Sequence, residues 1–284
     1  VYPSLVEPYV GEPFITGARL LDVPENEADA LRAVAVEVRT RNGRTDLCFS
    51  DGRPRARRIG DAGVEGRFAY VSRDAQGLRL AVLTEGRELA LPEGRLRLAA
   101  SALTARVAQV DYLARRVWLD GTWPVEGLAG EQVEFGNAGR RTSFTVLGAR
   151  VEGERTLLEL DKAIDLSYAA VTGVIENRRV VGVNVAPVGM GIAGKREGLA
   201  CSNDAMTRTW KCRYAGRHER LGHLYQLEGE MAAGDFPVGS VLRVWEFGPG
   251  DEARLAVRAA VRREAGGGLR LETNARAEWA PAGR

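Results

Sequence analysis

The chain has few of the residue types that reactive sites are built from. It contains only two histidines and three cysteines, and the cysteines show neither a CxxC motif nor a zinc-type spacing. No apolar run approaches the roughly 18 residues that suggest a membrane span. Forty basic and 38 acidic residues leave a net charge of +2, whereas a general nucleic-acid binder usually carries a basic stripe. We therefore expect no metal, no cofactor, no nucleic acid and no membrane span.

Hairpin signals, in contrast, are abundant. Residues 34–39 alternate valine with other residues, the pair Asn42-Gly43 follows, and residues 45–50 alternate again. An Asn-Gly pair between two alternating runs is a strong hairpin signal, because both turn positions need a positive φ. Similar patterns recur as far as the C-terminus, and 34 glycines suit many tight turns. The sequence predicts an all-β fold, as a large, two-layer antiparallel β-sandwich.

The predicted strands suggest one large module over residues 1–284, with an internal division into 1–102, 103–161 and 162–284 left open. Residues 103–161 contain about five strands with short loops, which could close as a small barrel or extend one sheet. Residues 1–30 contain four prolines, and we expect them to be mostly irregular. The spacing of Leu221, Leu224 and Tyr225 allows one short helix, although two nearby glycines weaken it.

Two groups of side chains are candidates for carbohydrate binding. Arg55, Arg57 and Arg58 lie in an arginine-rich segment that could hold an anionic polymer or simply be a solvated loop. Trp118 is out of phase with its apolar neighbours and Trp123 follows in a loop, so both could stack on sugar rings. Tryptophan is also commonly buried, and this alternative stays open.

One polar stretch has the residue types for proton abstraction. Tyr214, Arg217, His218 and Tyr225 lie close together in the sequence. Eliminative cleavage beside a uronic acid needs a base and a group that stabilises the developing enolate. These four residues are catalytic candidates, and the alternative is a polar loop at the edge of the fold.

Other motifs give no firm assignment. His218 and His223 are five residues apart, a spacing that points them to different sides of a helix or a strand. The spaced glycines of residues 189–194 lack the βαβ context of a dinucleotide site, so they indicate a turn. Cys201 and Cys212 flank a polar stretch and could form a cross-strand disulfide or remain free thiols, and the cellular compartment stays open.

Several phrases resemble the β-sandwich region of heparinase II/III-type polysaccharide lyases. They are residues 36–46 (VEVRTRNGRTD), 66–72 (GRFAYVS), 107–112 (VAQVDY), 141–146 (RTSFTV), 236–240 (FPVGS) and 247–251 (FGPGD). The likeness is one of pattern over most of the chain and includes no catalytic signature.

The resemblance implies a helical toroid followed by antiparallel β layers, an acidic polysaccharide in the cleft between them, and tyrosine and histidine acting in β-elimination. It also implies a secreted or periplasmic location. This sequence shows no toroid-like helical segment and begins with Val1, so we expect a piece of a longer polypeptide that packs on a helical catalytic domain. The expected function is a non-catalytic module of a polysaccharide-degrading enzyme. The alternatives are a free-standing carbohydrate-binding or cell-surface structural domain, and a complete lyase.

Overall fold

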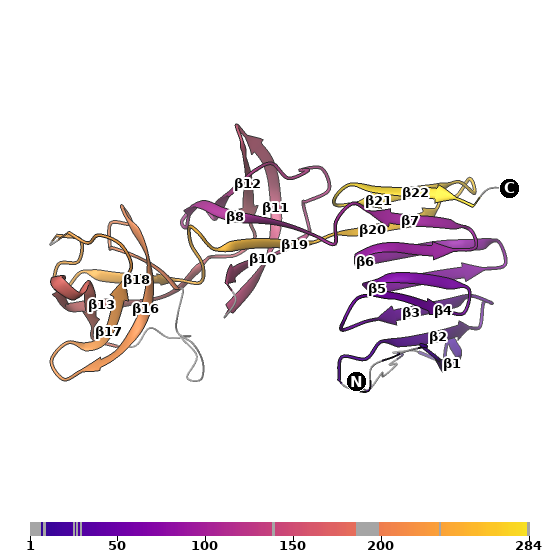
Figure 1. Cartoon of the computed structure of the whole chain (residues 1–284), viewed down its shortest axis with the longest axis horizontal. Coiled ribbons are helices and arrows are strands. Elements are labelled where there is room, and N and C mark those ends of the chain that lie inside the picture. Colours follow the sequence, from indigo (N-terminus) through magenta and orange to yellow (C-terminus); the bar gives the residue numbers. More distant parts are fainter. Residues whose placement is uncertain are drawn as a thin grey trace. The chain divides into compact units, whose positions relative to one another are not determined.

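The computed structural model describes the chain except for residues 1–6, 8–9, 25, 27, 29, 138–139, 186–198, 233 and 283–284. Its regular secondary structure is almost entirely strand, and the described residues contain one helical element, the 3₁₀ turn η1 (Glu176–Arg178). The strand pairs within the sheets are antiparallel (Figure 1). The predicted all-β antiparallel fold is therefore confirmed. The chain forms two compact units, residues 1–103 with 256–284, and residues 104–255.

The first unit is one ten-stranded sheet. Its strands are β1 (Ile15–Leu21), β2 (Val34–Thr40), β3 (Thr45–Ser50), β4 (Ala56–Ile59), β5 (Ala62–Asp74), β6 (Gly77–Leu91), β7 (Gly94–Leu98), β20 (Arg258–Arg263), β21 (Leu269–Thr273) and β22 (Ala277–Pro281). The predicted Asn42-Gly43 hairpin joins β2 to β3, with Gly43 at φ +77°.

A bend in the longest hairpin folds this sheet into two layers. Residues 62–65 of β5 pair with β4, whereas residues 68–73 pair with β3, and the register of β5 against β6 shifts at Gly66. Gly66 faces Gly86 at the bend, and a Cβ at Gly86 would lie 2.5 Å from the carbonyl oxygen of Glu65. Glycine is needed here because the two backbones approach too closely for any side chain.

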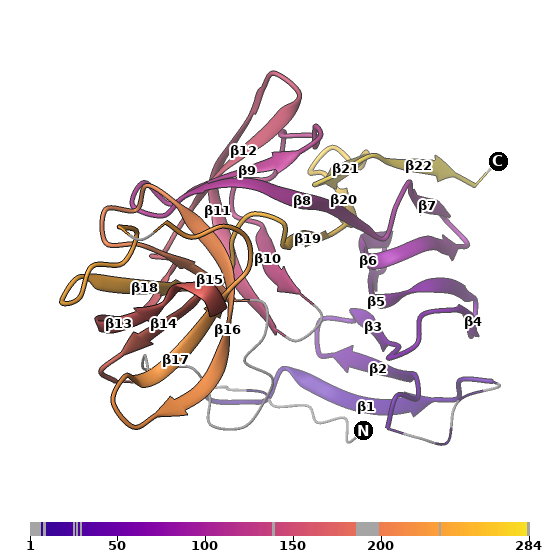
Figure 2. The same cartoon turned by 60° about the vertical axis from the view of Figure 1, so that its left-hand side comes forward.

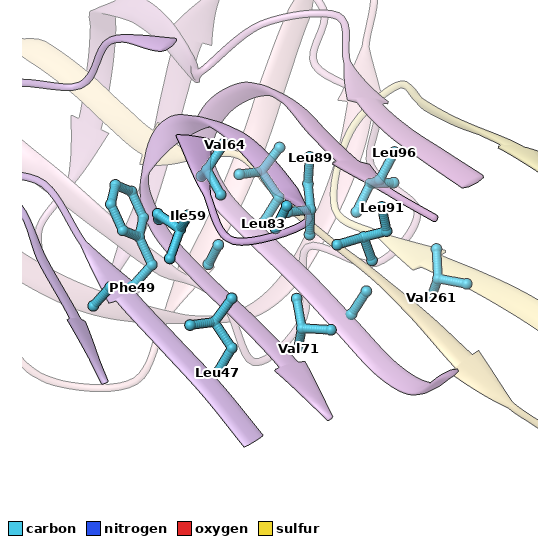
Figure 3. Close-up of a cluster of buried hydrophobic side chains, with 14 of the residues drawn as sticks. Leu47, Phe49, Ile59, Val64, Val71, Leu83, Leu89, Leu91, Leu96 and Val261 are labelled. Atoms are coloured by element: carbon cyan, nitrogen blue, oxygen red, sulfur yellow. The ribbon is translucent and has the colours of Figure 1, made fainter. Parts of the chain in front are cut away.

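The core of the first unit lies between these two layers. Figure 3 shows side chains from β3, β20 and the adjoining parts of β5 and β6 facing others from β4, β7 and the remaining parts of β5 and β6. The labelled members are Leu47, Phe49, Val71, Leu83 and Val261 on one side and Ile59, Val64, Leu89, Leu91 and Leu96 on the other. Period-two alternation along each strand supplies these inward residues, so the packing is that of a sandwich.

Two features of the first unit were not apparent from the sequence. Strand β1 forms within the segment expected to be irregular, and pairs with β2 as an exposed edge strand whose side chains give little alternation. The C-terminal strands return to the N-terminal sheet, where β20 pairs with β6 and β22 pairs with β7. Long-range pairing of this kind leaves no local sequence signal.

The second unit contains two closed barrels (Figures 1 and 2). The first consists of β8 (Ala102–Asp111), β9 (Arg116–Asp120), β10 (Gln132–Asn137), β11 (Arg140–Glu152), β12 (Arg155–Leu160) and β19 (Glu252–Ala256). The second consists of β13 (Asp165–Ile175), β14 (Val180–Val183), β15 (Leu199–Ser202), β16 (Thr209–His218), β17 (Gly222–Leu227) and β18 (Val241–Trp245).

These barrels confirm one expectation and correct another. The barrel-like subregion near residues 103–161 forms, and it is closed by the distant strand β19, which pairs with β10. The short helix considered around Leu221 is instead the β16–β17 hairpin. Gly222 follows its turn at φ +71°, where a Cβ would meet the carbonyl oxygen of Val183 at 2.3 Å. A continuous helix through this glycine would require a negative φ.

Buried aromatic side chains connect the end of the second barrel to the first. The ring of Tyr112 stacks on Trp245 with centroids 3.9 Å apart, and Phe247 stacks on Phe135 at 4.3 Å. The hydroxyl of Tyr112 donates a hydrogen bond to the carbonyl oxygen of Phe247 at 3.2 Å. The segment after β18 is thus held by both stacking and a hydrogen bond.

Candidate functional site

Trp118 lies on the outer surface of the first barrel, in the middle of β9. Its neighbours Val117 and Leu119 point inward and are fully buried, whereas Trp118 is partly exposed. The predicted phase of Trp118 is the one seen in the structure, because successive side chains of a strand point to opposite faces.

The indole of Trp118 extends across the neighbouring strand. Its Nε1–H donates a hydrogen bond of 2.8 Å to Oε2 of Glu152 on β11. Strand β12 lies between β9 and β11, and its residue Leu157 is the cross-strand neighbour of Trp118. Leu157 belongs to the outer face of the barrel and is nevertheless fully buried. The indole therefore crosses β12 on the face to which Leu157 belongs, and Trp118 remains partly exposed.

Charged side chains surround this indole and are matched in ion pairs. The pairs are Arg150–Glu152 at 2.8 Å, Arg116–Glu159 at 3.3 Å and Arg155–Asp120 at 3.8 Å. The hydrogen bond from Trp118 and then the one from Arg150 lower the pKa of Glu152. Glu152 therefore remains an acceptor for the indole at neutral pH. We call Trp118, Leu157 and these six charged residues the Trp118 face.

Trp123 is placed differently from its predicted role. It is buried, with 6% of its surface exposed, and its backbone N–H donates to Oγ1 of Thr156 at 2.7 Å. The structure therefore places Trp123 in the packing of the first barrel and not on a sugar-binding surface, as the sequence had suggested. The loop position suggested exposure, but the hydrogen bond to an inward residue of β12 draws the segment inside.

The arginine candidates are split by the alternation of β4. Arg57 is buried, and its Nε–H donates to Oδ2 of Asp51 at 2.9 Å, with both side chains almost completely enclosed. Arg55 and Arg58 are exposed. Arg57 is therefore not one of the predicted polysaccharide contacts. Its buried charge is compensated by Asp51 and is not accessible to a ligand. Arg55 and Arg58 lie in the first unit.

The tyrosine and histidine candidates lie in the second barrel. The hydroxyl of Tyr214 is hydrogen bonded to Nδ1 of His223 at 2.9 Å, and the ring of Tyr214 contacts that of Tyr225 edge-on. Tyr225 is fully buried, and the other two are partly buried. The histidine that pairs with Tyr214 is thus His223 and not His218, as the shared phase of residues 223 and 225 on one strand could have indicated.

The other two candidates of this stretch have separate roles. Nδ1 of His218 accepts hydrogen bonds from the backbone N–H groups of Arg220 and Leu221 at 3.2 and 3.3 Å. His218 therefore stabilises the turn between β16 and β17. Arg217 is exposed and lies opposite His223 in the strand register. The four residues do not form one constellation, although Arg217 and the Tyr214–His223 pair are close in the sheet.

The three cysteines are free. Cys201 is opposite Trp210 and Cys212 is opposite Leu199, so the two cysteines are offset by two residues across β15 and β16. Such diagonal positions lie roughly 7–8 Å apart, whereas the Cα atoms of a disulfide are usually about 4.4–6.8 Å apart. Burial, and then the contact with Cys212, raise the pKa of Cys201, which keeps it a thiol.

A shallow depression of about 310 Å³ lies between the start of β8 and the segment before β19, lined in part by Arg106, Asp251 and Glu252. Its acidic groups already have partners. Asp251 lies 2.5 Å from Nζ of Lys211, and Oε1 of Glu252 accepts a hydrogen bond from Arg141 at 2.6 Å. We therefore regard the Trp118 face as the better candidate surface.

The described part of the chain contains no helix that could span a membrane. Over the same part of the chain, no three histidine, cysteine, aspartate or glutamate side chains are grouped to hold a metal ion. The spaced glycines of residues 189–194 lie outside the described residues. Comparison with known proteins found no matching family model, and no curated protein or solved structure with significant similarity.

Proposed function

We propose that this chain is a non-catalytic β module of a polysaccharide-degrading enzyme. Several of its segments resemble the β-sandwich region of heparinase II/III-type lyases. In this proposal it supports a helical catalytic domain and contacts the polysaccharide through the Trp118 face. The observation that carries the proposal is the position of Trp118, an indole that is hydrogen bonded to Glu152 across β12 and partly exposed on the outside of a barrel.

The chemistry of sugars fits this arrangement. One side of a pyranose ring presents C–H groups and packs against a flat aromatic ring, while the hydroxyl groups at its rim hydrogen bond to planar polar side chains. Trp118 supplies the ring, and Arg150 and Glu152 lie at its edge. The rigid strands of the barrel fix this geometry before a ligand binds, which reduces the entropy lost on binding.

Affinity electrophoresis in gels containing different polysaccharides tests the proposal. Retardation of the intact chain by a polysaccharide, lost in Trp118→Ala, is the expected result. Phe68→Ala is the matched control, because Phe68 is 40% exposed and lies on the first unit. Migration unchanged by every polysaccharide, or equal retardation of the wild type and Trp118→Ala, would contradict a glycan contact through this face.

A free-standing carbohydrate-binding or cell-surface domain would use the same face, so the supporting role needs a separate test. A helical domain encoded in the same polypeptide, and co-purifying with this chain after limited proteolysis, is the expected result. Release of this chain as a separate species in gel filtration would favour the free-standing alternative.

The hydrogen bond between Tyr214 and His223 favours a second candidate, a lyase acting by β-elimination. Such an enzyme would form unsaturated uronic products that absorb ultraviolet light. Tyr214→Phe removes the phenolic proton while retaining the ring, and it would abolish this absorbance change. We expect no increase with any uronate polymer, and an increase that Tyr214→Phe removes would replace our proposal with this one.

A further inference from the structure

We infer that the Trp118 face binds neutral pyranosyl units in preference to uronates. This inference rests on the proposed glycan contact and specifies its ligand. The resemblance to polysaccharide lyases points to an acidic polymer, whereas the side chains around Trp118 point to an uncharged one.

The first argument is the balance of charge on the Trp118 face. Its three arginines are matched by three acidic residues, and each arginine lies within 4 Å of a carboxylate. Arg150 also lies 3.2 Å from Glu159, so it contacts two carboxylates at once. A uronate carboxylate would have to displace one of these partners and would be repelled by the others. A neutral hydroxyl has neither cost.

The second argument is the kind of hydrogen-bonding groups that surround the indole. A sugar hydroxyl both donates and accepts, so it suits a surface that offers carboxylate acceptors beside guanidinium donors. Gln109 adds an exposed amide, with a donor and an acceptor, opposite Trp118 in the register of β8 and β9. The surroundings of Trp118 thus offer both donors and acceptors, as an uncharged polyhydroxylated ligand requires.

The third argument is the fixed position of the indole. Its single donor, Nε1–H, is bonded to Glu152, so the ring is oriented without help from the ligand. Binding would then depend on packing between the ring and the C–H face of the sugar. Packing of this kind is insensitive to salt, unlike the attraction between charged groups.

The test is isothermal titration of the intact chain with cellohexaose, mannohexaose and hexagalacturonate at low and high salt. We expect one of the neutral oligosaccharides to bind with an affinity that salt leaves unchanged, and the uronate to bind at least about tenfold more weakly. Trp118→Ala is expected to weaken the neutral ligand about tenfold or more, as for the loss of a central aromatic contact. Trp118→Phe retains an aromatic ring at this position and is expected to keep a measurable part of the affinity.

The outcomes distinguish this inference from the proposed function. Salt-sensitive binding of hexagalacturonate alone, lost in Trp118→Ala, would refute the preference for neutral sugars. It would still support the proposed glycan contact through the Trp118 face. Neutral binding that survives in both Trp118 variants would overturn the inference, because the site would lie elsewhere. No binding of any of the three, in a chain whose circular dichroism spectrum is that of folded strands, would count against both.

Discussion

Strand β4 of the sandwich and the β9 segment of the first barrel each carry two similar side chains with opposite fates. In β4, Arg57 is enclosed with Asp51 whereas Arg58 is exposed. In the other segment, Trp123 is buried and Trp118 is partly exposed on the outside of the barrel. The comparison teaches that residue type alone does not identify a binding side chain in this fold. The phase of the strand and the hydrogen bonds of the adjoining loop decide which member of each pair is accessible.

The largest effect on stability is expected from removing the carboxylate that pairs with the buried Arg57. Asp51→Ala leaves the guanidinium of Arg57 buried without its carboxylate, which we expect to reduce the free energy of unfolding by about 3–5 kcal/mol. Arg58→Ala, one residue along the same strand, is expected to change it by no more than about 0.5 kcal/mol. Urea unfolding of the two variants measures the difference. Equal midpoints would contradict the assignment of Arg57 to the interior.

The two tryptophans provide the same contrast in the barrel. Trp123→Ala creates a cavity beside β12 and is expected to cost about 3 kcal/mol of unfolding free energy. Trp118→Ala removes a partly exposed ring and its hydrogen bond to Glu152, and is expected to cost about 1 kcal/mol. The order of the two thermal midpoints is the measurement. A lower midpoint for Trp118→Ala than for Trp123→Ala would reverse the comparison.

Much of the fold could be predicted from the sequence, but the candidate site could be predicted only in part. Local alternation and turn chemistry predicted the hairpin at Asn42-Gly43 and the outward phase of Trp118, because both depend on neighbouring residues alone. The burial of Arg57 depends on Asp51, and that of Trp123 on Thr156, 33 residues away. Side-chain hydrogen bonds of this kind have no local signature, and neither does the closure of the first barrel by β19.

A smaller effect concerns register rather than phase. Cys201 and Cys212 share an inward face but are offset along β15 and β16, so we expect both to remain thiols under mild oxidation. Titration with a thiol reagent is expected to give three free thiols in the unfolded chain, with Cys201 and Cys212 protected in the folded one. A mass spectrum showing a linked 201–212 peptide before reduction would contradict the offset.

The smallest effect sharpens the description of Trp118. The pKa of Glu152 is lowered below its ordinary value of 4.5 by the indole and by Arg150. The bond to the charged carboxylate is therefore fully present above pH 4.5 and is lost as the pH falls through the lowered pKa. The indole N–H signal of Trp118 in a nuclear magnetic resonance spectrum should move in this acidic range. It should stay constant in Glu152→Gln, and a shift that persists in this variant would refute Glu152 as its cause.

The order in which the layers are completed has a consequence for synthesis of the chain. Strands β1–β7 begin the sandwich and β8–β12 begin the first barrel, but β19 closes that barrel and β20–β22 finish the sandwich only after β13–β18 have formed a barrel of their own. In the sequence, the strands of the first barrel flank those of the second barrel, and the strands of the sandwich flank both. The second barrel is therefore the first of the three to have all its strands synthesised. The second barrel is thus the natural nucleus of co-translational folding, while the earlier strands wait with unpaired edges that a chaperone would need to shield.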